Sequence, residues 1–265
     1  MACASPVPTD PASAAPSAVS ASASQSGYRY GDFDIGDGRL LRVECYGDAS
    51  PTILLESGDE AGSSQWGAVM ADLPDVSRTC SYDRAGVGLS SEATGCRGLA
   101  DLTGDLERLL EVADIGGPYV LVATSGGGFI AAEFAREHAD EIAGIVFLDV
   151  PGLTDPPPSL PPDLVERLAC DHALNIEHRE YLGVEREAWD ARAEIGDIPV
   201  TIVSNDYGPD AVGEEASNVE AQQGWMVLSP RATQVIVTSG HNVPYEEPEL
   251  VLDEVRAVVE AARQP

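Results

Sequence analysis

One stretch of the chain, residues 119–148, restricts the possible folds more than any other. It opens with a continuous apolar run over 119–122, which is too short for a helix and is typical of a buried strand in a parallel sheet. Small residues follow, and apolar side chains then recur at helical spacing at Phe129, Ile130 and Phe134. The stretch therefore predicts a buried strand that turns directly into a helix.

Ser125 occupies the turn between this strand and this helix. It is flanked by Ala123 and Gly127, and larger side chains at these two positions would collide in so tight a turn. The Gly126 NH starts the helix, where an unpaired donor and the helix dipole stabilise developing negative charge. Ser125 is therefore a candidate nucleophile. The pattern A-x-S-x-G departs from the usual G-x-S-x-G, however, and it also fits a tight crossover with an unreactive serine.

Strands and amphipathic helices alternate along the rest of the chain. An antiparallel hairpin is expected over residues 28–46, around a turn at Gly36-Asp37-Gly38. The later alternation implies an α/β fold, with a mostly parallel sheet of about eight strands and helices on both faces. Strands are expected at 52–55, 78–82, 119–122, 144–148, 198–203 and 234–237, and helices near 66–73, 99–110, 129–134, 164–168, 177–189, 219–228 and 248–259.

The alternation breaks down between residues 151 and 196. Prolines at 156–158, 161 and 162 disfavour regular structure, so only short helical pieces are expected there. We therefore expect this insertion to form a small lid over the mouth of a site. The expected parts of the chain are a tether over 1–27, a core made of 28–150 and 197–265, and the lid insertion over 151–196.

The charge of the chain excludes some classes of partner. There are 45 acidic and 15 basic residues, which gives a formal net charge of -30, and every basic residue is Arg. Such a surface repels nucleic acid and anionic lipid headgroups, so we expect neither as a partner. The excess of carboxylates fits a protein from a high-salt habitat, where screening relieves self-repulsion, or an acidic secreted enzyme.

Residues 1–27 are rich in Ala, Ser and Pro and carry one charge, at Asp10. They cannot bury enough apolar area to fold, so we expect a disordered tether. Cys3 followed by such a tether resembles the mature end of a bacterial lipoprotein. This resemblance implies an exported, cell-surface or extracellular protein with its signal peptide removed and a lipid anchor at Cys3. An ordinary cytoplasmic start with an incidental cysteine is the alternative.

Four short motifs occur in a fixed order along the chain: LLESG at 54–58, SYDRAGVGLS at 81–90, ATSGGG at 123–128 and SGHNVP at 239–244. In this order and at this spacing they make the chain resemble the α/β-hydrolase superfamily over residues 28–262. The resemblance implies the α/β-hydrolase fold and a hydrolytic enzyme that uses no cofactor and no metal.

The resemblance also implies roles for particular residues. Ser125 matches the nucleophile. His241, in the loop after the last strand, matches the general base that takes the serine proton and later protonates the leaving group. For the acid, the commonest family location is the loop after the penultimate strand, which offers Asp206, with Asp210 less favoured. Some members instead place the acid after the strand that follows the elbow helix, where Asp149 lies. We favour Asp206 narrowly.

The family builds its oxyanion hole from backbone NH groups, which here would belong to Gly126 and to Asp59, the residue after Gly58. A carboxylate at Asp59 would oppose developing negative charge if it pointed inward. We therefore expect the Asp59 side chain to turn to solvent or to hold a cationic substrate group or a water. Arg84 is expected to pin neighbouring loops through charge-assisted hydrogen bonds.

The expected reaction is hydrolysis of a carboxylic ester or related acyl substrate through an acyl-enzyme on Ser125. Gly58, Trp66 and Phe129 are candidate substrate contacts, although core packing is the favoured role for Trp66 and Phe129. Lactones and amides are less favoured. Because residue 125 is Ser rather than Asp, dehalogenation and epoxide opening through an alkyl-enzyme ester are disfavoured. The alternatives are a cofactor-free haloperoxidase-like enzyme, a C–C hydrolase with the same triad, and a non-catalytic member that serves as a binding module.

Four cysteines remain when Cys3 is set aside, and in an exported chain they permit two disulfides. In the sheet implied by the fold, the strands of Cys45 and Cys80 are neighbours, so this pair is the first choice. Cys96 with Cys170 follows by elimination. Spacing alone does not decide the connectivity.

Overall fold

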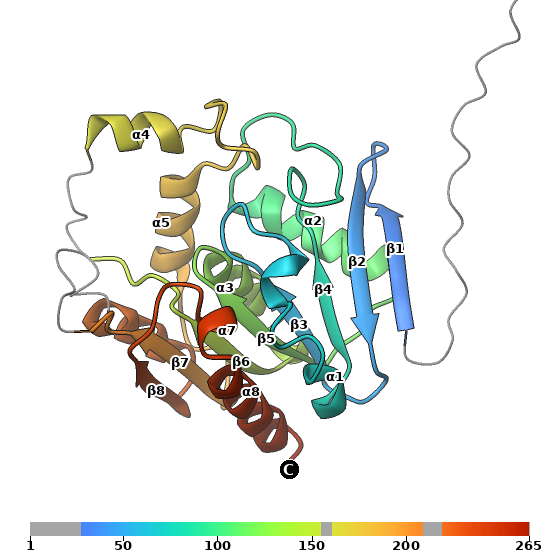
Figure 1. The fold of residues 1–265 in the computed structure, drawn as a ribbon, viewed down its shortest axis with the longest axis vertical. Coiled ribbons are helices and arrows are strands. Elements are labelled where there is room, and N and C mark those ends of the chain that lie inside the picture. Colours follow the sequence, from blue (N-terminus) through green and yellow to red (C-terminus); the bar gives the residue numbers. More distant parts are fainter. Residues whose placement is uncertain (1–27, 155–160, 209–218, 265) are drawn as a thin grey trace, which may run out of the picture.

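A computed structural model describes residues 28–154, 161–208 and 219–264. Its centre is an eight-stranded sheet in the order β1-β2-β4-β3-β5-β6-β7-β8 (Figure 1). The pairs β1–β2 and β2–β4 are antiparallel, and all later pairs are parallel. The predicted fold class is therefore confirmed. The strands are β1 (Tyr28–Asp34), β2 (Leu40–Tyr46), β3 (Thr52–Glu56), β4 (Thr79–Tyr82), β5 (Tyr119–Thr124), β6 (Ile142–Leu148), β7 (Val200–Asn205) and β8 (Ala232–Val237).

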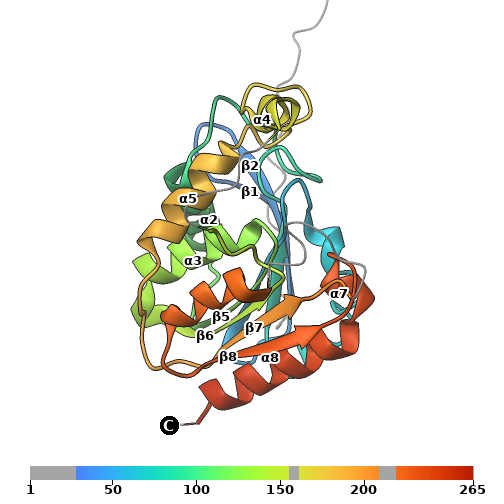
Figure 2. The same cartoon turned by 90° about the vertical axis from the view of Figure 1, so that its left-hand side faces the viewer.

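Helices cover both faces of this sheet (Figure 2). On one face lie α2 (Leu99–Val112), α3 (Gly127–Glu137) and α5 (Tyr181–Ala191), and on the other lie α1 (Leu73–Val76) and α8 (Pro248–Ala262). The shorter helices are η1 (Ser63–Trp66), η2 (Ala139–Glu141), α4 (Pro162–Leu168), η3 (Gln223–Leu228) and α7 (Val243–Glu246).

The core consists of two apolar layers, one on each face of the sheet. In β5, Leu121 and Ala123 belong to one layer, whereas Val120 and Val122 belong to the other. Successive side chains of a strand point to opposite faces, so an uninterrupted apolar strand must be covered on both. This explains why the apolar run at the start of residues 119–148 predicted a central parallel strand.

The segment after β3 differs from the single short helix that we expected. It forms η1 and then, beyond a series of turns, α1. Ser63 and Ser64 do not cap this segment, because Gly62 occupies the N-cap position and no side chain caps it. The Ser63 NH instead donates to Asp83 Oδ1 at 2.7 Å. The Asp83 carboxylate thus accepts the first NH of η1 in place of a capping side chain.

The insertion, residues 151–196, carries α4 and α5 between β6 and β7. Helix α5 packs on α3 and buries Trp189, whose ring lies 5.0 Å from that of Trp225. None of the residues of α4, all of which are described, is buried. The insertion is therefore fixed to the core through α5, while α4 stands at its outer edge (Figure 1).

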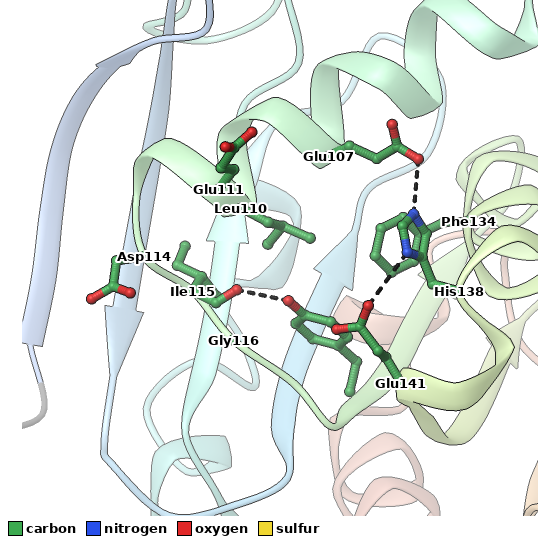
Figure 3. A pocket seen from close by; sticks show the side chains of 10 residues that line it. Glu107, Leu110, Glu111, Asp114, Ile115, Gly116, Phe134, His138 and Glu141 are labelled. Atoms are coloured by element: carbon green, nitrogen blue, oxygen red, sulfur yellow. Dashed lines mark hydrogen bonds and ion pairs between the residues drawn. The ribbon is translucent and has the colours of Figure 1, made fainter.

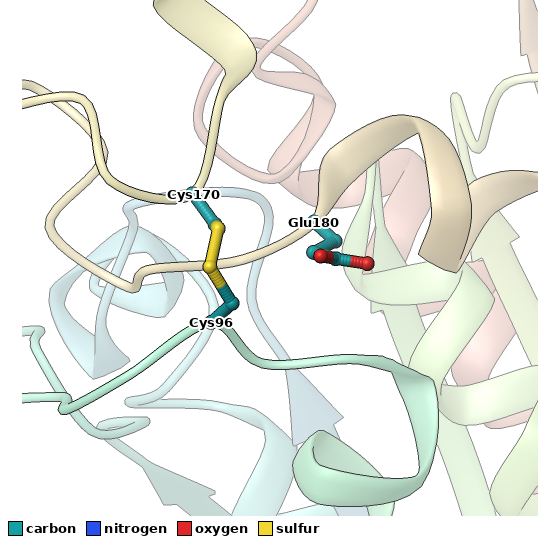
Figure 4. Close-up of side chains that lie close together, drawn as sticks. All are labelled: Cys96, Cys170 and Glu180. Carbon is teal, nitrogen blue, oxygen red and sulfur yellow. A yellow bond between two sulfur atoms is a disulfide. The ribbon is translucent and has the colours of Figure 1, made fainter.

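Both predicted disulfides are present. Cys45–Cys80 joins the paired strands β2 and β4, and Cys96–Cys170 joins the loop before α2 to the insertion. Glu180 lies beside the second bridge (Figure 4). Within the described ranges, no helix has the length and apolarity needed to cross a membrane. Cys3 and the expected tether lie outside the described residues.

Candidate active site

Ser125 lies at the turn from β5 to α3, as the sequence predicted. Its φ of 50° is in the left-handed region, which non-glycine residues rarely adopt. The turn has no room for side chains around it: a Cβ on Gly127 would lie 2.2 Å from the carbonyl oxygen of Ser57. The small residues are therefore a steric requirement of this turn.

A chain of hydrogen bonds joins three residues from separate parts of the sequence. The Ser125 hydroxyl lies 2.8 Å from His241 Nε2, and His241 Nδ1 lies 2.7 Å from Asp149 Oδ2. Asp149 follows the end of β6, and His241 lies in the loop between β8 and α7. The parallel strands thus bring these residues to the same edge of the sheet. The arrangement can take a proton from Ser125 and stabilise the resulting imidazolium.

The acid that we favoured from the sequence does not lie behind His241. Asp206 accepts hydrogen bonds from the Thr238 hydroxyl at 2.7 Å and from the Gly208 NH at 2.9 Å. Both bonds lower the pKa of Asp206, and the bond from Thr238 has the larger effect. The choice of Asp206 is therefore corrected to Asp149, because the Asp206 carboxylate is used to close its own turn. Asp210 lies outside the described residues.

Asp149 is completely buried and also has a left-handed backbone, with φ of 50°. Besides His241, its carboxylate accepts hydrogen bonds from Gln222 Nε2 at 2.9 Å and from the hydroxyl of Tyr207. The Tyr207 hydroxyl also lies 3.0 Å from His241 Nδ1. Sequence reasoning missed Tyr207 and Gln222, because neither stands in a motif and their partner, Asp149, lies 58 and 73 positions away.

The pKa of His241 is raised above its ordinary value. The hydrogen bond that His241 donates to Asp149 is the main cause, and it outweighs the opposing effect of burial. The negative charges of Asp59 and Glu246 add to the increase. The imidazole is therefore a stronger base than a free histidine, which suits a group that must take a proton from a serine.

Gly58, Asp59 and Gly126 surround Ser125. A Cβ on Gly58 would lie 3.2 Å from Ser125 Cβ, so the β3 loop passes directly beside the serine. Among the residues that the structure describes, no acceptor takes a hydrogen bond from the backbone NH of Asp59 or Gly126. The two NH groups that we expected in an oxyanion hole are thus available to a ligand.

The side chain of Asp59 takes neither of the two positions that we expected. It lies against Gly126, where a Cβ would be 2.1 Å from Asp59 Oδ1. It forms an ion pair with Arg179 of the insertion, whose side chain is completely buried. Arg179 Nη2 also donates to the carbonyl oxygen of Gly126 at 3.1 Å. Sequence reasoning missed Arg179, because nothing local in the insertion indicates a contact 120 positions away.

Arg84 pins neighbouring loops, as predicted. Its guanidinium forms ion pairs with Glu56 at 2.6 Å and with Glu177 of the insertion at 2.7 Å. It also donates to the carbonyl oxygens of Ser57 and Gly58, both at 2.6 Å. Burial alone would raise the pKa of Glu177, but the positive charge of Arg84 and its hydrogen bonds leave that pKa lowered. The loop that carries Asp59 is thus fastened to both core and insertion.

Trp66 and Phe129, predicted as substrate contacts, both have 0% of their surface exposed. Trp66 donates to the hydroxyl of Ser57 at 2.9 Å, and the ring of Phe129 lies 5.6 Å from that of Trp225. Both therefore belong to the core, which was the favoured role, and neither is a substrate contact. Of the three predicted contacts, only Gly58 lies against Ser125.

A cavity of about 330 Å³ lies at the other end of the sheet (Figure 3). His138, at the end of α3, points into it and lies 2.8 Å from Glu107 and 3.5 Å from Glu141. The cavity borders Tyr119, the first residue of β5, whereas Ser125 follows the last. At about 3.3 Å per residue, the strand separates them by roughly 20 Å. This cavity is unrelated to Ser125.

Comparisons with known proteins agree with this fold. The family model of the alpha/beta hydrolase fold matches residues 51–174. The uncharacterized protein YqjL of Bacillus subtilis is 28% identical over 215 residues, which cover 77% of this chain and 82% of YqjL. A thermophilic esterase from Thermogutta terrifontis superposes with a TM-score of 0.70 at 19% identity, covering 89% of this chain and all of the esterase. Cfl2 from Burkholderia cenocepacia superposes with a TM-score of 0.66 at 23% identity, covering 87% and 95%. With the sheet order and the family match over residues 51–174 together, the chain has the alpha/beta hydrolase fold.

Proposed function

We propose that this α/β-hydrolase is a serine hydrolase that cleaves carboxylic esters or related acyl substrates. The observation that carries the proposal is the hydrogen-bonded chain from Ser125 through His241 to the buried Asp149. A serine beside a basic imidazole, which in turn is oriented by a carboxylate, is the arrangement that activates a hydroxyl for attack on a carbonyl.

In the proposed reaction, Ser125 Oγ attacks the substrate carbonyl carbon and His241 Nε2 takes the hydroxyl proton. The carbonyl oxygen becomes an oxyanion, which the NH groups of Gly126 and Asp59 stabilise. His241 then gives its proton to the leaving alcohol as the C–O bond breaks, and an acyl-enzyme remains on Ser125. Water repeats the sequence, giving a proton to His241 and releasing the acid and free Ser125.

Asp149 holds the imidazole so that Nε2 faces the serine, and it stabilises the imidazolium formed in each step. Its burial suits this role, because a buried negative charge acts on the imidazolium with little screening by water. The hydrogen bonds from Gln222 and Tyr207 fix the direction of the carboxylate.

The nature of the nucleophile supports acyl transfer. Opening an epoxide or displacing a halide through an alkyl-enzyme ester requires a carboxylate at the elbow, and residue 125 is Ser. We therefore place carboxylic esters first among the substrates.

Labelling with a fluorophosphonate tests this proposal directly, because the reagent phosphonylates only an activated serine. We expect wild-type protein to be labelled on Ser125, and Ser125→Ala to remain unlabelled and to lose ester turnover by on the order of 10⁴-fold or more. Ser64→Ala, which changes an exposed serine after β3, is the matched control and should be labelled like the wild type. Folded wild-type protein that takes no label would instead support a non-catalytic binding module.

A further inference from the structure

We propose that Arg179 is a positioning residue for this reaction: it neutralises the Asp59 carboxylate beside the oxyanion site, so that negative charge can develop on the substrate oxygen. The inference rests on the proposed function. It assigns a chemical role to the insertion, which supplies a positive charge to the loop after β3.

The position of Asp59 creates the need for such a residue. Its backbone NH is one of the two donors proposed for the oxyanion, and its carboxylate lies against the Cα of Gly126, the other donor. An unpaired carboxylate at this place would repel the oxyanion within a few ångströms, although the Asp59 side chain is 27% exposed and water screens part of the repulsion. The Asp59 carboxylate would then oppose the stabilisation that the Asp59 NH gives to the oxyanion.

The contacts of Arg179 answer this need. One guanidinium nitrogen forms the ion pair with Asp59, and the other donates to the carbonyl oxygen of Gly126 at 3.1 Å. Its Nε has no hydrogen-bond partner among the described residues. Burying a guanidinium costs free energy unless it is paired, so the buried Arg179 holds Asp59 strongly. Because Arg179 is completely buried, it acts through Asp59 and leaves the substrate untouched.

The segment around Arg179 is itself fixed. Asn175 Oδ1 accepts the Arg179 NH at 3.1 Å, and Asn175 Nδ2 donates to the Arg179 carbonyl at 2.8 Å. The backbone on either side of Arg179 is hydrogen-bonded to Arg97. The Arg97 NH donates to the carbonyl oxygen of His178 at 2.8 Å, and the Glu180 NH donates to the carbonyl oxygen of Arg97 at 3.0 Å. Two residues earlier, Glu177 is held by Arg84. This anchoring presents the guanidinium to Asp59 in one position.

Several charged groups face this pair and His241, and they set what a pH measurement would report. From α5, Glu185 feels the charges of both Asp59 and Arg179, and burial first and Asp59 second raise its pKa to about 7. Around His241, the negative groups are Asp149, Asp59 and Glu246, and the Tyr207 hydroxyl lies 3.0 Å from Nδ1. Removing Arg179 leaves Asp59 uncompensated, so the pKa of His241 should rise further.

A double-mutant cycle separates this role from a merely structural one. The variants are Arg179→Gln, Asp59→Asn and the double variant, with Arg179→Lys as the charge-conserving control. With a p-nitrophenyl ester, we expect Arg179→Gln to lower kcat by about 10- to 100-fold, with a smaller change in KM. Arg179→Lys should retain more of kcat than Arg179→Gln. Adding Asp59→Asn to Arg179→Gln should restore at least about tenfold of the loss, because the opposing charge is gone.

The His241 titration, followed by imidazole NMR without substrate, gives a second readout that needs no turnover. We expect its midpoint to rise in Arg179→Gln and to return in the double variant. The proposal is overturned if the double variant is no more active than Arg179→Gln, or if the midpoint does not move. Failure of the proposed function is distinguishable, since it would appear as wild-type protein that takes no fluorophosphonate label while the His241 midpoints still respond.

Discussion

Three residues that meet at the candidate site share an uncommon backbone conformation. Ser125, Asp149 and Tyr207 have φ values of 50°, 50° and 52°. Each lies just beyond a strand, where the chain must turn sharply to bring its side chain over the edge of the sheet. Such left-handed residues cost roughly 1–2 kcal/mol each. The surrounding hydrogen bonds offset that cost and fix the three side chains in place.

Replacing each of the two candidate acids by Asn in turn tests the assignment of Asp149. We expect Asp149→Asn to lower kcat for a p-nitrophenyl ester by on the order of 10⁴-fold, because the imidazole loses the group that orients it and balances its charge. Asp206→Asn removes a carboxylate that only closes a turn, so its kcat should stay within about threefold of the wild type. Equal losses in the two variants would contradict the assignment.

The raised pKa of His241 predicts the pH dependence of turnover. Only the neutral imidazole can take the serine proton, so kcat/KM should increase as pH rises through the free-enzyme pKa of His241. That midpoint should lie above the ordinary value of 6.5, because the hydrogen bond that His241 donates to Asp149 raises it. The residual activity of Asp149→Asn should show a lower midpoint. A wild-type midpoint below 6.5 would argue against the pairing.

Local sterics made part of the site predictable from the sequence. The elbow needs small neighbours around Ser125, and His241 follows the last strand in a recognisable motif. The acid was not predictable in this way, because Asp149 and Asp206 both follow a central strand. The outcome depends on the turn after β7, which uses the Asp206 carboxylate for Gly208 and Thr238.

Among the elements, the part of the insertion before α5 connects otherwise separate pieces of the site. Glu177 and Arg179 reach the loop after β3 through Arg84 and Asp59, respectively. The carbonyl of Ile176 lies so close to Gly86 that a Cβ there would be 2.1 Å away, and the φ of Gly86 is +90°. A glycine is therefore required where the insertion crosses the β4 loop. The sequence predicted that an insertion exists but not these contacts, which join residues far apart in the chain.

The two disulfides allow a matched test of this element. In the chain-entropy model, loops of 74 and 35 residues both correspond to about 4 kcal/mol, so removing either bridge should cost similar stability. We expect Cys96→Ala/Cys170→Ala to lower kcat several-fold, because it loosens the segment that carries Arg179. Cys45→Ala/Cys80→Ala lies between β2 and β4 and should keep kcat within about twofold of the wild type.

Urea unfolding measures the stability of both double variants, and ester turnover well below their unfolding midpoints measures activity. If the two variants lost activity equally, the effect would come from general destabilisation, and the Cys96–Cys170 bridge would have no special connection to the site.

For the molecule as a whole, net charge is the dominant electrostatic property. With 45 acidic and only 15 basic residues, carboxylates outnumber their possible partners threefold. The most buried arginines, Arg84 and Arg179, are engaged near the candidate site. The remaining excess of negative charge stays near the surface, where it repels itself and destabilises the compact state.

Salt should therefore stabilise the protein. Raising NaCl from 0.1 M to 1 M shortens the screening length from about 10 Å to about 3 Å, so we expect Tm to rise by several degrees. The same series at pH 5, where fewer carboxylates are ionised, should show a smaller increase. Calorimetry or circular dichroism measures this effect. A Tm that falls with salt would mean that attractive ion pairs outweigh the repulsion.

The whole-molecule fold was predictable because its signals are repetitive. Continuous apolar strands such as β5 occur only where both faces are covered, and their alternation with helices leaves few topologies. Residues 63–76 do not form the single helix that we expected. Gly62 precedes η1, and the Ser63 NH donates to Asp83. That hydrogen bond is a tertiary contact with no counterpart in local spacing.

The sharing of Arg84 between Glu56 of the core and Glu177 of the insertion bears on how this enzyme could be re-engineered. A foreign cap grafted between β6 and β7 would have to bring its own acid for Arg84 and its own base for Asp59. A graft lacking them would leave stranded charges inside the scaffold. A replacement for the insertion must therefore match the charges of Arg84 and Asp59 as well as the shape of the site.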